Sequence, residues 1–339
     1  MKVLLSNQKI KCCGRYHLDG DELKCAFSAS GFEFSARLSG GVTVNCEIDC
    51  KDEERGGCLI GVMINDDFEN MTEIVVENSA KSFTAVENLP NGDYIIRIVK
   101  LNEFNSNTVT FKSVECDGEL LDKPSDKPLK FEFYGDSLTC GYGNLSSDRL
   151  PPTPFNELEH AYRTYAAFLA REFNAEISVC AQSGYGILHD YDGGNGVLRT
   201  YYNMALPLEN VKWNFDNYKA DAVFINIGSN DFNFAKNSKT KLHTSDILNE
   251  FRSVVDDIRV HNPECKLIFN IGISDSPIFN EYCDLIEVYE KITAMYDNAY
   301  FITNLQCNQL GGNFHPNVDD HRTVFKKFMY RLKEQRVDF

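Results

Sequence analysis

The stretch FYGDSLTCGYG places Ser137 directly after a short apolar segment and between glycines. The residues at 130–134 are typical of a buried strand, so Ser137 is predicted to lie in a tight turn just beyond the end of that strand. A hydroxyl exposed in such a turn is suited to act as the nucleophile of an acyl transfer. Serine next to glycine is more often only a turn residue, and this stretch alone leaves both interpretations open.

Three later segments carry the other groups that acyl transfer needs. Gly184, in SGYG, can present a backbone N–H with no side chain in the way, and Asn230, in GSND, offers a side-chain amide. His315, in NFHPN, offers a base near the end of the sequence. Acyl transfer requires a nucleophile, a base that takes its proton and donors aimed at the oxyanion, and Ser137 together with these three segments supplies each kind.

The elements that must bring these groups together alternate between strands and helices after about residue 130. Short apolar segments are separated by amphipathic segments with a three-to-four residue spacing. The strand candidates are residues 130–134, 176–181, 222–227, 267–272 and 299–303. This alternation predicts a parallel five-stranded sheet with helices on both sides, and a site beyond the carboxyl ends of its strands.

The first third of the sequence has a different texture. Residues 1–116 read as short alternating or apolar segments, such as VTVNCEI at 42–48, separated by turn signals and without a helical period. We therefore predict an all-β, jelly-roll-type sandwich domain over residues 1–116. Residues 117–129 carry two prolines and several charges and are predicted to be a linker, so that residues 130–339 form the second domain.

The overall composition excludes several classes of partner. A chain of 339 residues with 43% hydrophobic residues can bury two cores, and its net charge of -16 does not suit binding to nucleic acid or to anionic lipid. No apolar run is long enough for a membrane helix, and the first residues do not read as a secretory leader. The twelve cysteines show no zinc spacing. We expect reduced thiols, no metal, and a cytoplasmic protein unless a leader has been removed.

Taken together, the four blocks resemble the SGNH, or GDSL, hydrolase superfamily. GDSL at 135–138, the glycine at 184, GSND at 228–231 and HP at 315–316 match its four blocks in order. More narrowly, the stretches GDSLTCGYGN and VFINIGSNDF and the N-terminal β domain resemble carbohydrate esterase family 2, a group of acetylxylan and acetyl-mannan esterases. The resemblance covers nearly the whole chain and implies an α/β/α SGNH-hydrolase domain over residues 130–339.

The resemblance also implies roles for individual residues. Ser137 would be the nucleophile and His315 the base, and the N–H groups of Ser137 and Gly184 with the Asn230 amide would hold the oxyanion. The implied reaction removes O-acetyl groups from xylan- or mannan-type carbohydrate through an acetyl-serine intermediate. It needs no metal or organic cofactor, and its partner is the acetylated carbohydrate substrate.

One position departs from the superfamily's common pattern. Many members carry an aspartate two or three residues before the histidine, whereas Asn313 and Gly312 occupy these places here. The departure puts a full triad in doubt, because the acid orients the imidazole. Carbohydrate esterase family 2, which this chain resembles, includes members with Ser–His dyads in which a main-chain carbonyl orients the histidine. We therefore expect a dyad in which Asn313 or a nearby carbonyl orients His315.

Other candidate residues have plainer interpretations. Asp136 and Asp231 are expected to brace loops by hydrogen bonds, and His321 to pack in the last helix. Tyr185, beside the glycine turn, either lines the cleft or packs against it. Trp213, the single tryptophan, either stacks on a sugar ring or belongs to a core, and its place shortly before a strand favours the core.

Two other functions stay open at this stage. A carbohydrate-binding protein with a decayed catalytic site would explain the missing aspartate but would have no need for all four blocks together. A lipase or thioesterase of the same superfamily would require a long apolar groove. Neither the sugar, the hydroxyl that carries the acetyl group nor the oligomeric state can be predicted from the sequence.

Overall fold

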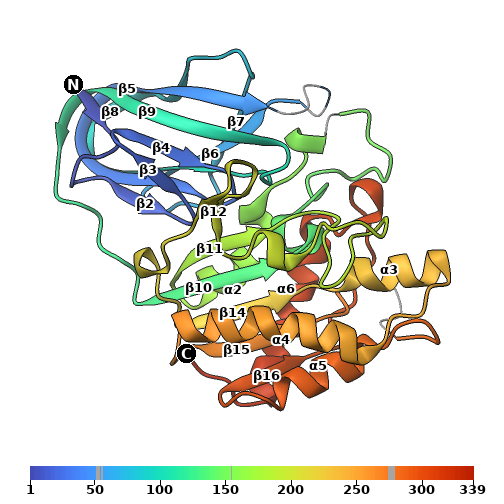
Figure 1. Ribbon diagram of the computed structural model, residues 1–339. Coiled ribbons are helices and arrows are strands. Elements are labelled where there is room, and N and C mark those ends of the chain that lie inside the picture. Colours follow the sequence, from blue (N-terminus) through green and yellow to red (C-terminus); the bar gives the residue numbers. More distant parts are fainter. Residues whose placement is uncertain (51–53, 55, 154, 274–278) are drawn as a thin grey trace. The chain divides into compact units, whose positions relative to one another are not determined.

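The computed structural model describes residues 1–50, 54, 56–153, 155–273 and 279–339 (Figure 1). The chain divides into two compact units. The first unit comprises Met1–Asp126, Pro152–Tyr162 and Ala205–Trp213, and the second comprises Lys127–Pro151, Arg163–Met204 and Asn214–Phe339. The domains that we predicted are consecutive pieces of sequence, whereas the first unit also includes two short segments from within the predicted second domain, residues 130–339.

The first unit is built from antiparallel strands, as predicted. Its strands are β1 (Lys2–Leu4), β2 (Lys11–Cys13), β3 (His17–Asp19), β4 (Glu22–Cys25), β5 (Gly31–Cys50), β6 (Cys58–Ile64), β7 (Thr72–Val76), β8 (Ser82–Lys100) and β9 (Asn107–Leu120). They pair in the order β3-β4-β9-β5-β8-β6-β7, with β1 on β9 and β2 on β5. Strand β9 continues through residues 117–120 of the predicted linker, of which Gly118, Glu119 and Leu120 pair with β5. The jelly-roll connectivity stays a prediction.

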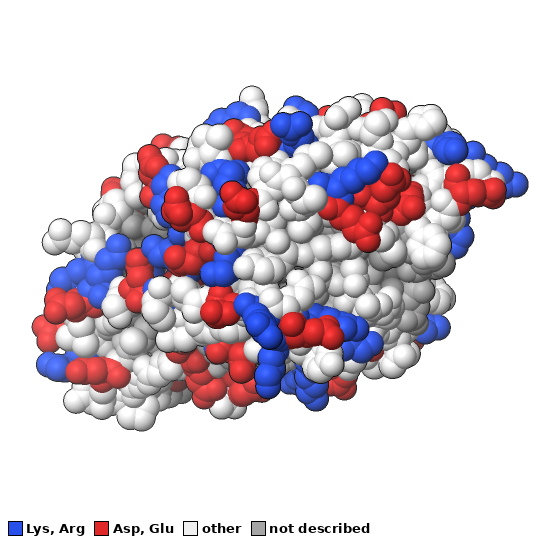
Figure 2. Space-filling model, turned by 90° about the horizontal axis from the view of Figure 1, so that it is seen from below, with Lys and Arg blue, Asp and Glu red and all other residues white. Residues whose placement is uncertain are grey.

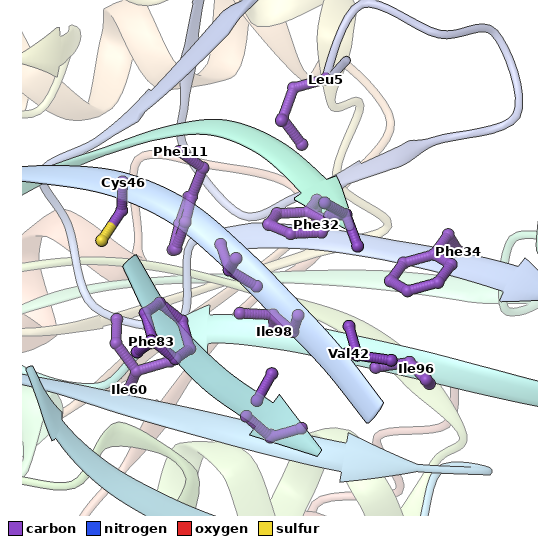
Figure 3. Close-up of a cluster of buried hydrophobic side chains, with 14 of the residues drawn as sticks. Leu5, Phe32, Phe34, Val42, Cys46, Ile60, Phe83, Ile96, Ile98 and Phe111 are labelled. Carbon is purple, nitrogen blue, oxygen red and sulfur yellow. The ribbon is translucent and has the colours of Figure 1, made fainter. Parts of the chain in front are cut away.

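The core of the first unit follows from the period-two pattern of its long strands. On β5, Phe32 and Phe34 are buried, and their cross-strand partners on β8 are Ile98 and Ile96. Figure 3 shows these side chains gathered with Phe111 between the strands. The ring of Phe32 meets that of Phe111 edge-on at a centroid distance of 5.2 Å. The alternation that indicated half-buried strands is thus the pattern that fills this core.

Most cysteines lie in the interior, and charged side chains of both signs lie on the surface (Figure 2). None of the twelve cysteines, all of which lie in the described ranges, forms a disulfide, and most are buried, where a thiol packs as a small apolar group. Acidic and basic side chains are interspersed over the face shown in Figure 2. None of the helices in the described ranges is both long enough and apolar enough to cross a membrane.

The second unit contains the predicted parallel five-stranded sheet. Its strands are β10 (Leu129–Gly135), β11 (Ala175–Ala181), β14 (Ala222–Asn226), β15 (Lys266–Asn270) and β16 (Ala299–Ile302). They lie in the order β11-β10-β14-β15-β16, so β10 has the next strand of the sheet on one side and a later one on the other (Figure 1). Crevices form outside the carboxyl ends of strands where the order reverses in this way. Ser137 follows β10 directly and therefore lies at this switch point.

Helices follow the strands as the amphipathic pattern predicts. They are α1 (Ser137–Cys140), α2 (Tyr165–Glu172), α3 (Ser229–Ser238), α4 (Thr244–His261), α5 (Leu285–Thr293) and α6 (Val318–Glu334). Short strands β12 (Met204–Leu206) and β13 (Val211–Lys212) pair with each other. Helix α6 begins with a capping box, in which the side chains of Asn317 and Asp320 each accept the backbone N–H of the other residue. The capping box fixes the start of α6 and therefore the end of the loop that carries His315.

The two faces of the parallel sheet are covered by different helices. Phe224 on β14 contacts Phe328 of α6 at a ring distance of 6.0 Å. Its register partner on β15 is Ile268, so the next residue, Phe269, points to the opposite face. There Phe269 meets Phe251 of α4 at 5.7 Å. Helix α2 packs beside α6, and α4 packs beside α5, which gives the predicted three-layer arrangement.

Candidate active site

The hydroxyl of Ser137 and the imidazole of His315 are in direct contact. Ser137 Oγ lies 2.8 Å from His315 Nε2, although the two residues are 178 positions apart. On the other side of the ring, Nδ1 lies 2.9 Å from the main-chain carbonyl oxygen of Asn313. Because a carbonyl oxygen can only accept, Nδ1 carries the hydrogen, and Nε2 is left to accept the hydroxyl proton of Ser137. This is the tautomer that base catalysis on Ser137 requires.

The backbone before His315 has an uncommon conformation that produces this contact. Asn313 and Phe314 both have positive φ angles, 50° and 59°, although neither is glycine. The N–H of Gly312 donates to the carbonyl of Gly143 at 2.9 Å, and the N–H of His315 donates to the carbonyl of Gly312 at 3.1 Å. These bonds hold a short 3₁₀ turn, Gly312–Phe314, against the loop that follows α1.

A glycine in the motif permits this approach. A Cβ at Gly143 would lie 2.7 Å from the carbonyl oxygen of Gly312, and Gly143 itself has a φ angle of +67°. Any other residue there would clash with the histidine loop and strain its own backbone. The last glycine of GDSLTCGYG is therefore explained by packing against the loop that carries His315.

The imidazole is neutral at pH 7 in this environment. Burial lowers the pKa of His315, and the carbonyls of Asn313 and Gly312 partly offset that effect by accepting its hydrogen. The ring of Tyr142 meets the imidazole edge-on at 4.9 Å. Within the described ranges no carboxylate is paired with His315, so a main-chain carbonyl takes the place that the superfamily's common pattern gives to an acid.

The turn that carries Ser137 is fixed by the aspartate beside it. Asp136 caps α1 by accepting the N–H of Leu138 at 3.0 Å, and it also accepts the hydroxyl of Ser229 at 2.5 Å. Burial raises the pKa of Asp136 to about 6, with these bonds acting in the opposite direction. The bond to Ser229 ties the start of α1 to the start of α3, so the residue before Ser137 is joined to the residue before Asn230. Asp136 thus braces the turn, as expected.

The side chain of Asn230 is oriented by a second backbone carbonyl. Its Nδ2 donates one hydrogen to the carbonyl oxygen of Tyr185 at 2.8 Å. The second Nδ2 hydrogen remains available for an oxyanion. The Tyr185 ring is half-buried and packs edge-on against Tyr201 at 5.6 Å, so Tyr185 contributes at least its main-chain carbonyl to the site. No motif in the sequence pointed to that carbonyl.

The glycine turn lies next to the serine turn. Ser183 Oγ lies 3.5 Å from Cys140 Sγ at the end of α1. Gly184 has a φ angle of +81°, and a Cβ there would meet the ring of Tyr191 at 3.0 Å. Neither the N–H of Ser137 nor that of Gly184 has an acceptor among the residues that the structure describes. Both donors are therefore free for a ligand.

A buried aspartate holds the loop that follows the glycine turn. Asp231 accepts three backbone N–H groups, from Ile187 and Leu188 at 2.7 Å each and from His189 at 2.9 Å. Burial raises the pKa of Asp231 to about 6, and the three N–H groups partly offset this rise. The predicted brace is present, and its target is the loop that carries the oxyanion donors.

Two predicted residues lie in core positions. Trp213 belongs to the first unit, where it is buried and meets the ring of Tyr16 edge-on at 5.6 Å. This is the core-packing alternative for Trp213. His321 in α6 is also buried, its Nδ1 accepts the N–H of Tyr165 at 3.3 Å, and burial lowers its pKa to about 3. His321 is thus a packing histidine, as expected.

Comparison with known proteins places these features in a family. Residues 133–322, more than half of the chain, match the GDSL-like lipase/acylhydrolase family. Residues 12–124 match the carbohydrate esterase 2 N-terminal family. The two matches fall on the parallel-sheet unit and on the antiparallel unit, so both parts of the chain are accounted for.

Individual relatives are similar over most of the chain. Cellulase/esterase CelE of Acetivibrio thermocellus is 26% identical over 95% of this chain, which spans 39% of that protein. An acetylxylan esterase/glucomannan deacetylase of Cellvibrio japonicus is 28% identical over 80% of each chain. A family two carbohydrate esterase from Clostridium thermocellum, solved in complex with cellohexaose, superposes with a TM-score of 0.83 at 25% identity, covering 96% of this chain and 99% of that one. The chain belongs to the GDSL-like lipase/acylhydrolase family, a class of carboxylic ester hydrolases, and has the two-part architecture of the family two carbohydrate esterases.

Proposed function

We propose that this protein is a serine esterase that removes O-acetyl groups from acetylated carbohydrate. The single observation that carries the proposal is the 2.8 Å contact between Ser137 Oγ and His315 Nε2, with the opposite ring nitrogen bonded to the Asn313 carbonyl. The relatives named above, an acetylxylan esterase/glucomannan deacetylase and a carbohydrate esterase complexed with cellohexaose, support the choice of an acetylated sugar.

In the first half of the reaction, His315 Nε2 takes the hydroxyl proton of Ser137. The alkoxide attacks the acetyl carbonyl carbon, and the carbonyl electron pair moves to oxygen. When the tetrahedral intermediate collapses, the bond to the sugar oxygen breaks and Nε2 returns its proton to that oxygen. The sugar leaves as an alcohol, and an acetyl group remains on Ser137.

The oxyanion is stabilised by the free donors around the serine. They are the N–H groups of Ser137 and Gly184 and the second Nδ2 hydrogen of Asn230. In the second half of the reaction, His315 takes a proton from water, the hydroxide attacks the acetyl-serine, and acetate leaves while Ser137 regains its proton. The imidazolium formed in each half is stabilised by the Asn313 carbonyl, which accepts the Nδ1 hydrogen.

Acetate release from a panel of acetylated oligosaccharides tests this proposal. The wild type is expected to release acetate from acetylated xylo-, manno- or gluco-oligosaccharides, and mapping the deacetylated hydroxyl identifies the preferred position. Ser137→Ala is expected to release none above background. Ser238→Ala, which removes an exposed hydroxyl at the end of α3, is the matched control and should keep full activity.

Three outcomes would contradict the proposal. Binding of the oligosaccharides without acetate release would favour a carbohydrate-binding protein. Cleavage of long acyl esters in preference to acetyl esters would favour a lipase or thioesterase. Equal acetate release by the wild type and Ser137→Ala would remove Ser137 from the reaction.

A further inference from the structure

The histidine loop is held in place by a residue from a distant part of the chain. Orientation of the Asn313 carbonyl depends on the ψ angle of Asn313 and the φ angle of Phe314, because these two rotations turn the peptide that joins them. Both residues are in the left-handed region, which side chains other than glycine disfavour. Contacts outside the loop must therefore keep this peptide from rotating to a more common conformation.

Arg149 contacts this loop at three points. Its main-chain carbonyl accepts the N–H of Asn313 at 2.7 Å. Its guanidinium carbon lies 5.0 Å from the centre of the Phe314 ring, and its Nε donates to the carbonyl of Gln309 at 3.3 Å. One residue thus contacts the chain before the 3₁₀ turn, at Gln309, and within the turn, at Asn313 and Phe314.

The aromatic contact is the one that can control the orienting carbonyl. The Phe314 side chain is 53% exposed, so the packed core does not hold its ring. Within the described part of the chain, no carboxylate forms an ion pair with Arg149. The guanidinium is therefore available for the ring, and a planar cation over an aromatic face is favourable even at the surface.

We propose that Arg149 is a positioning residue that keeps the Asn313 carbonyl against His315 Nδ1 by holding the Phe314 ring and the Gln309 carbonyl. The proposal rests on the Ser137–His315 reaction proposed above. Arg149 acts through the loop and touches neither the reacting atoms nor the acetyl group. In a triad, an aspartate orients the imidazole directly. Here the contacts of Arg149 with the loop orient the Asn313 carbonyl, and that carbonyl orients the imidazole.

The test combines kinetics on a small acetyl ester with a direct observation of the imidazole. With 4-nitrophenyl acetate, Arg149→Met is expected to lower kcat about tenfold with KM nearly unchanged, a part of the 10²–10⁴ that base catalysis supplies. Arg149→Lys, which keeps a cation over the ring, should recover about a third of the loss. In ¹H NMR spectra, the Nδ1 hydrogen of His315 should exchange with water faster in Arg149→Met than in the wild type.

A double-mutant cycle separates positioning from general destabilisation. Because Arg149 acts through the ring, Phe314→Leu should lower kcat by a similar factor, and the double variant Arg149→Met/Phe314→Leu should be no slower than either single variant. Arg331→Met is the matched control, since this arginine lies 5.6 Å from the ring of Tyr330 at the end of α6. It should leave both kcat and the imidazole signal unchanged.

Different results would overturn the positioning role of Arg149 and the proposed esterase reaction. An unchanged kcat and an unchanged Nδ1 hydrogen exchange rate in Arg149→Met would overturn the positioning role while leaving the esterase intact. Multiplicative losses in the double variant would do the same. Retained activity in Ser137→Ala would overturn the proposed reaction, and the exchange rate of the Nδ1 hydrogen would still test Arg149 by itself.

Discussion

The two sides of the site are held by different kinds of interaction. On the serine side, buried carboxylates do the positioning: Asp136 fixes the serine turn, and Asp231 accepts three backbone N–H groups of the loop after the glycine turn. On the histidine side, the imidazole is oriented by the neutral carbonyl of Asn313. A buried carboxylate thus braces each of these two turns, whereas the imidazole of His315 is oriented without a carboxylate.

This difference predicts which parts of the site respond to pH. A main-chain carbonyl does not titrate, so the acceptor that orients His315 keeps its hydrogen bond to Nδ1 across the pH range. Asp136 and Asp231 have pKa values raised by burial to about 6, so both are ionised at neutral pH and become protonated as the pH falls below 6. Each then loses acceptor capacity for the groups that it braces.

The largest effect is expected from removing either reacting side chain. Ser137→Ala and His315→Ala should each lower kcat by about 10⁴ or more, and the double variant should be no slower than the slower single variant, because the two groups act as a unit. Steady-state kinetics with an acetyl ester measure this. If the double variant were slower than both by the product of their effects, the two side chains would not share one step.

Removal of an oxyanion donor is expected to have the next largest effect. Asn230→Ala should lower kcat by about 10²–10³ with little change in KM, because the second Nδ2 hydrogen bonds the developing oxyanion. Asn237→Ala, an exposed asparagine further along α3, serves as the control and should match the wild type. Equal kcat values for Asn230→Ala and Asn237→Ala would remove Asn230 from the oxyanion site.

A smaller effect is expected from neutralising the brace on the serine side. Asp231→Asn replaces one of two accepting oxygens by an N–H₂ group that faces backbone donors, so kcat should fall about tenfold. Asp297→Asn, a surface aspartate, is the control. Full activity in Asp231→Asn would show that the loop at 187–189 does not need its anionic anchor.

The same variant has a pH signature in stability. The pKa of Asp231 is about 6 in the folded state and about 3.9 in unfolded chains, so the folded state binds more protons between these values. The free energy of unfolding contributed by this group therefore falls as the pH rises from about 4 to about 6, with a slope approaching 1.4 kcal/mol per pH unit. Urea titrations of wild type and Asp231→Asn should differ by this slope, and parallel pH profiles would contradict it.

The smallest effect is expected on the histidine side, from a change that keeps the main chain. Asn313→Gly removes the side-chain amide, retains the carbonyl and suits the φ angle of 50°, so kcat should change by less than about threefold. Kinetics on the same acetyl ester measure this. A loss of 10² or more would assign the orientation of His315 to the side chain and would break the contrast between the two sides.

Much of the serine side was predictable from sequence because its groups follow strands. Ser137, Gly184 and Asn230 each come directly after an apolar strand segment, and parallel strands bring their carboxyl ends to one rim. The aspartates beside Ser137 and Asn230 were predicted to be braces as their plainer interpretation. Coordinates were required for the partner of each brace, such as the loop at 187–189 for Asp231, and for the Tyr185 carbonyl that orients Asn230.

The histidine side was less predictable because backbone conformation and distant contacts decide it. Sequence identifies Asn313 as a departure from an acid, but the positive φ angles of Asn313 and Phe314 are set by tertiary contacts. Arg149 belongs to no motif, and its contact with Phe314 joins segments far apart in the chain.

The burial of Trp213 also depends on contacts between distant segments. Residues Ala205–Trp213 group with the first unit, and Trp213 is buried there.

In the proposed reaction, the acetyl group passes from the sugar to Ser137 and from the acetyl-serine to water. Rapid mixing with an acetyl ester, acid quenching and mass spectrometry of the digested protein test this claim most directly. We expect one acetyl group on the peptide that contains Ser137, present during turnover in the wild type and absent in Ser137→Ala. Turnover without an acetylated peptide, or an acetyl group on a different residue that is lost at the rate of turnover, would contradict it.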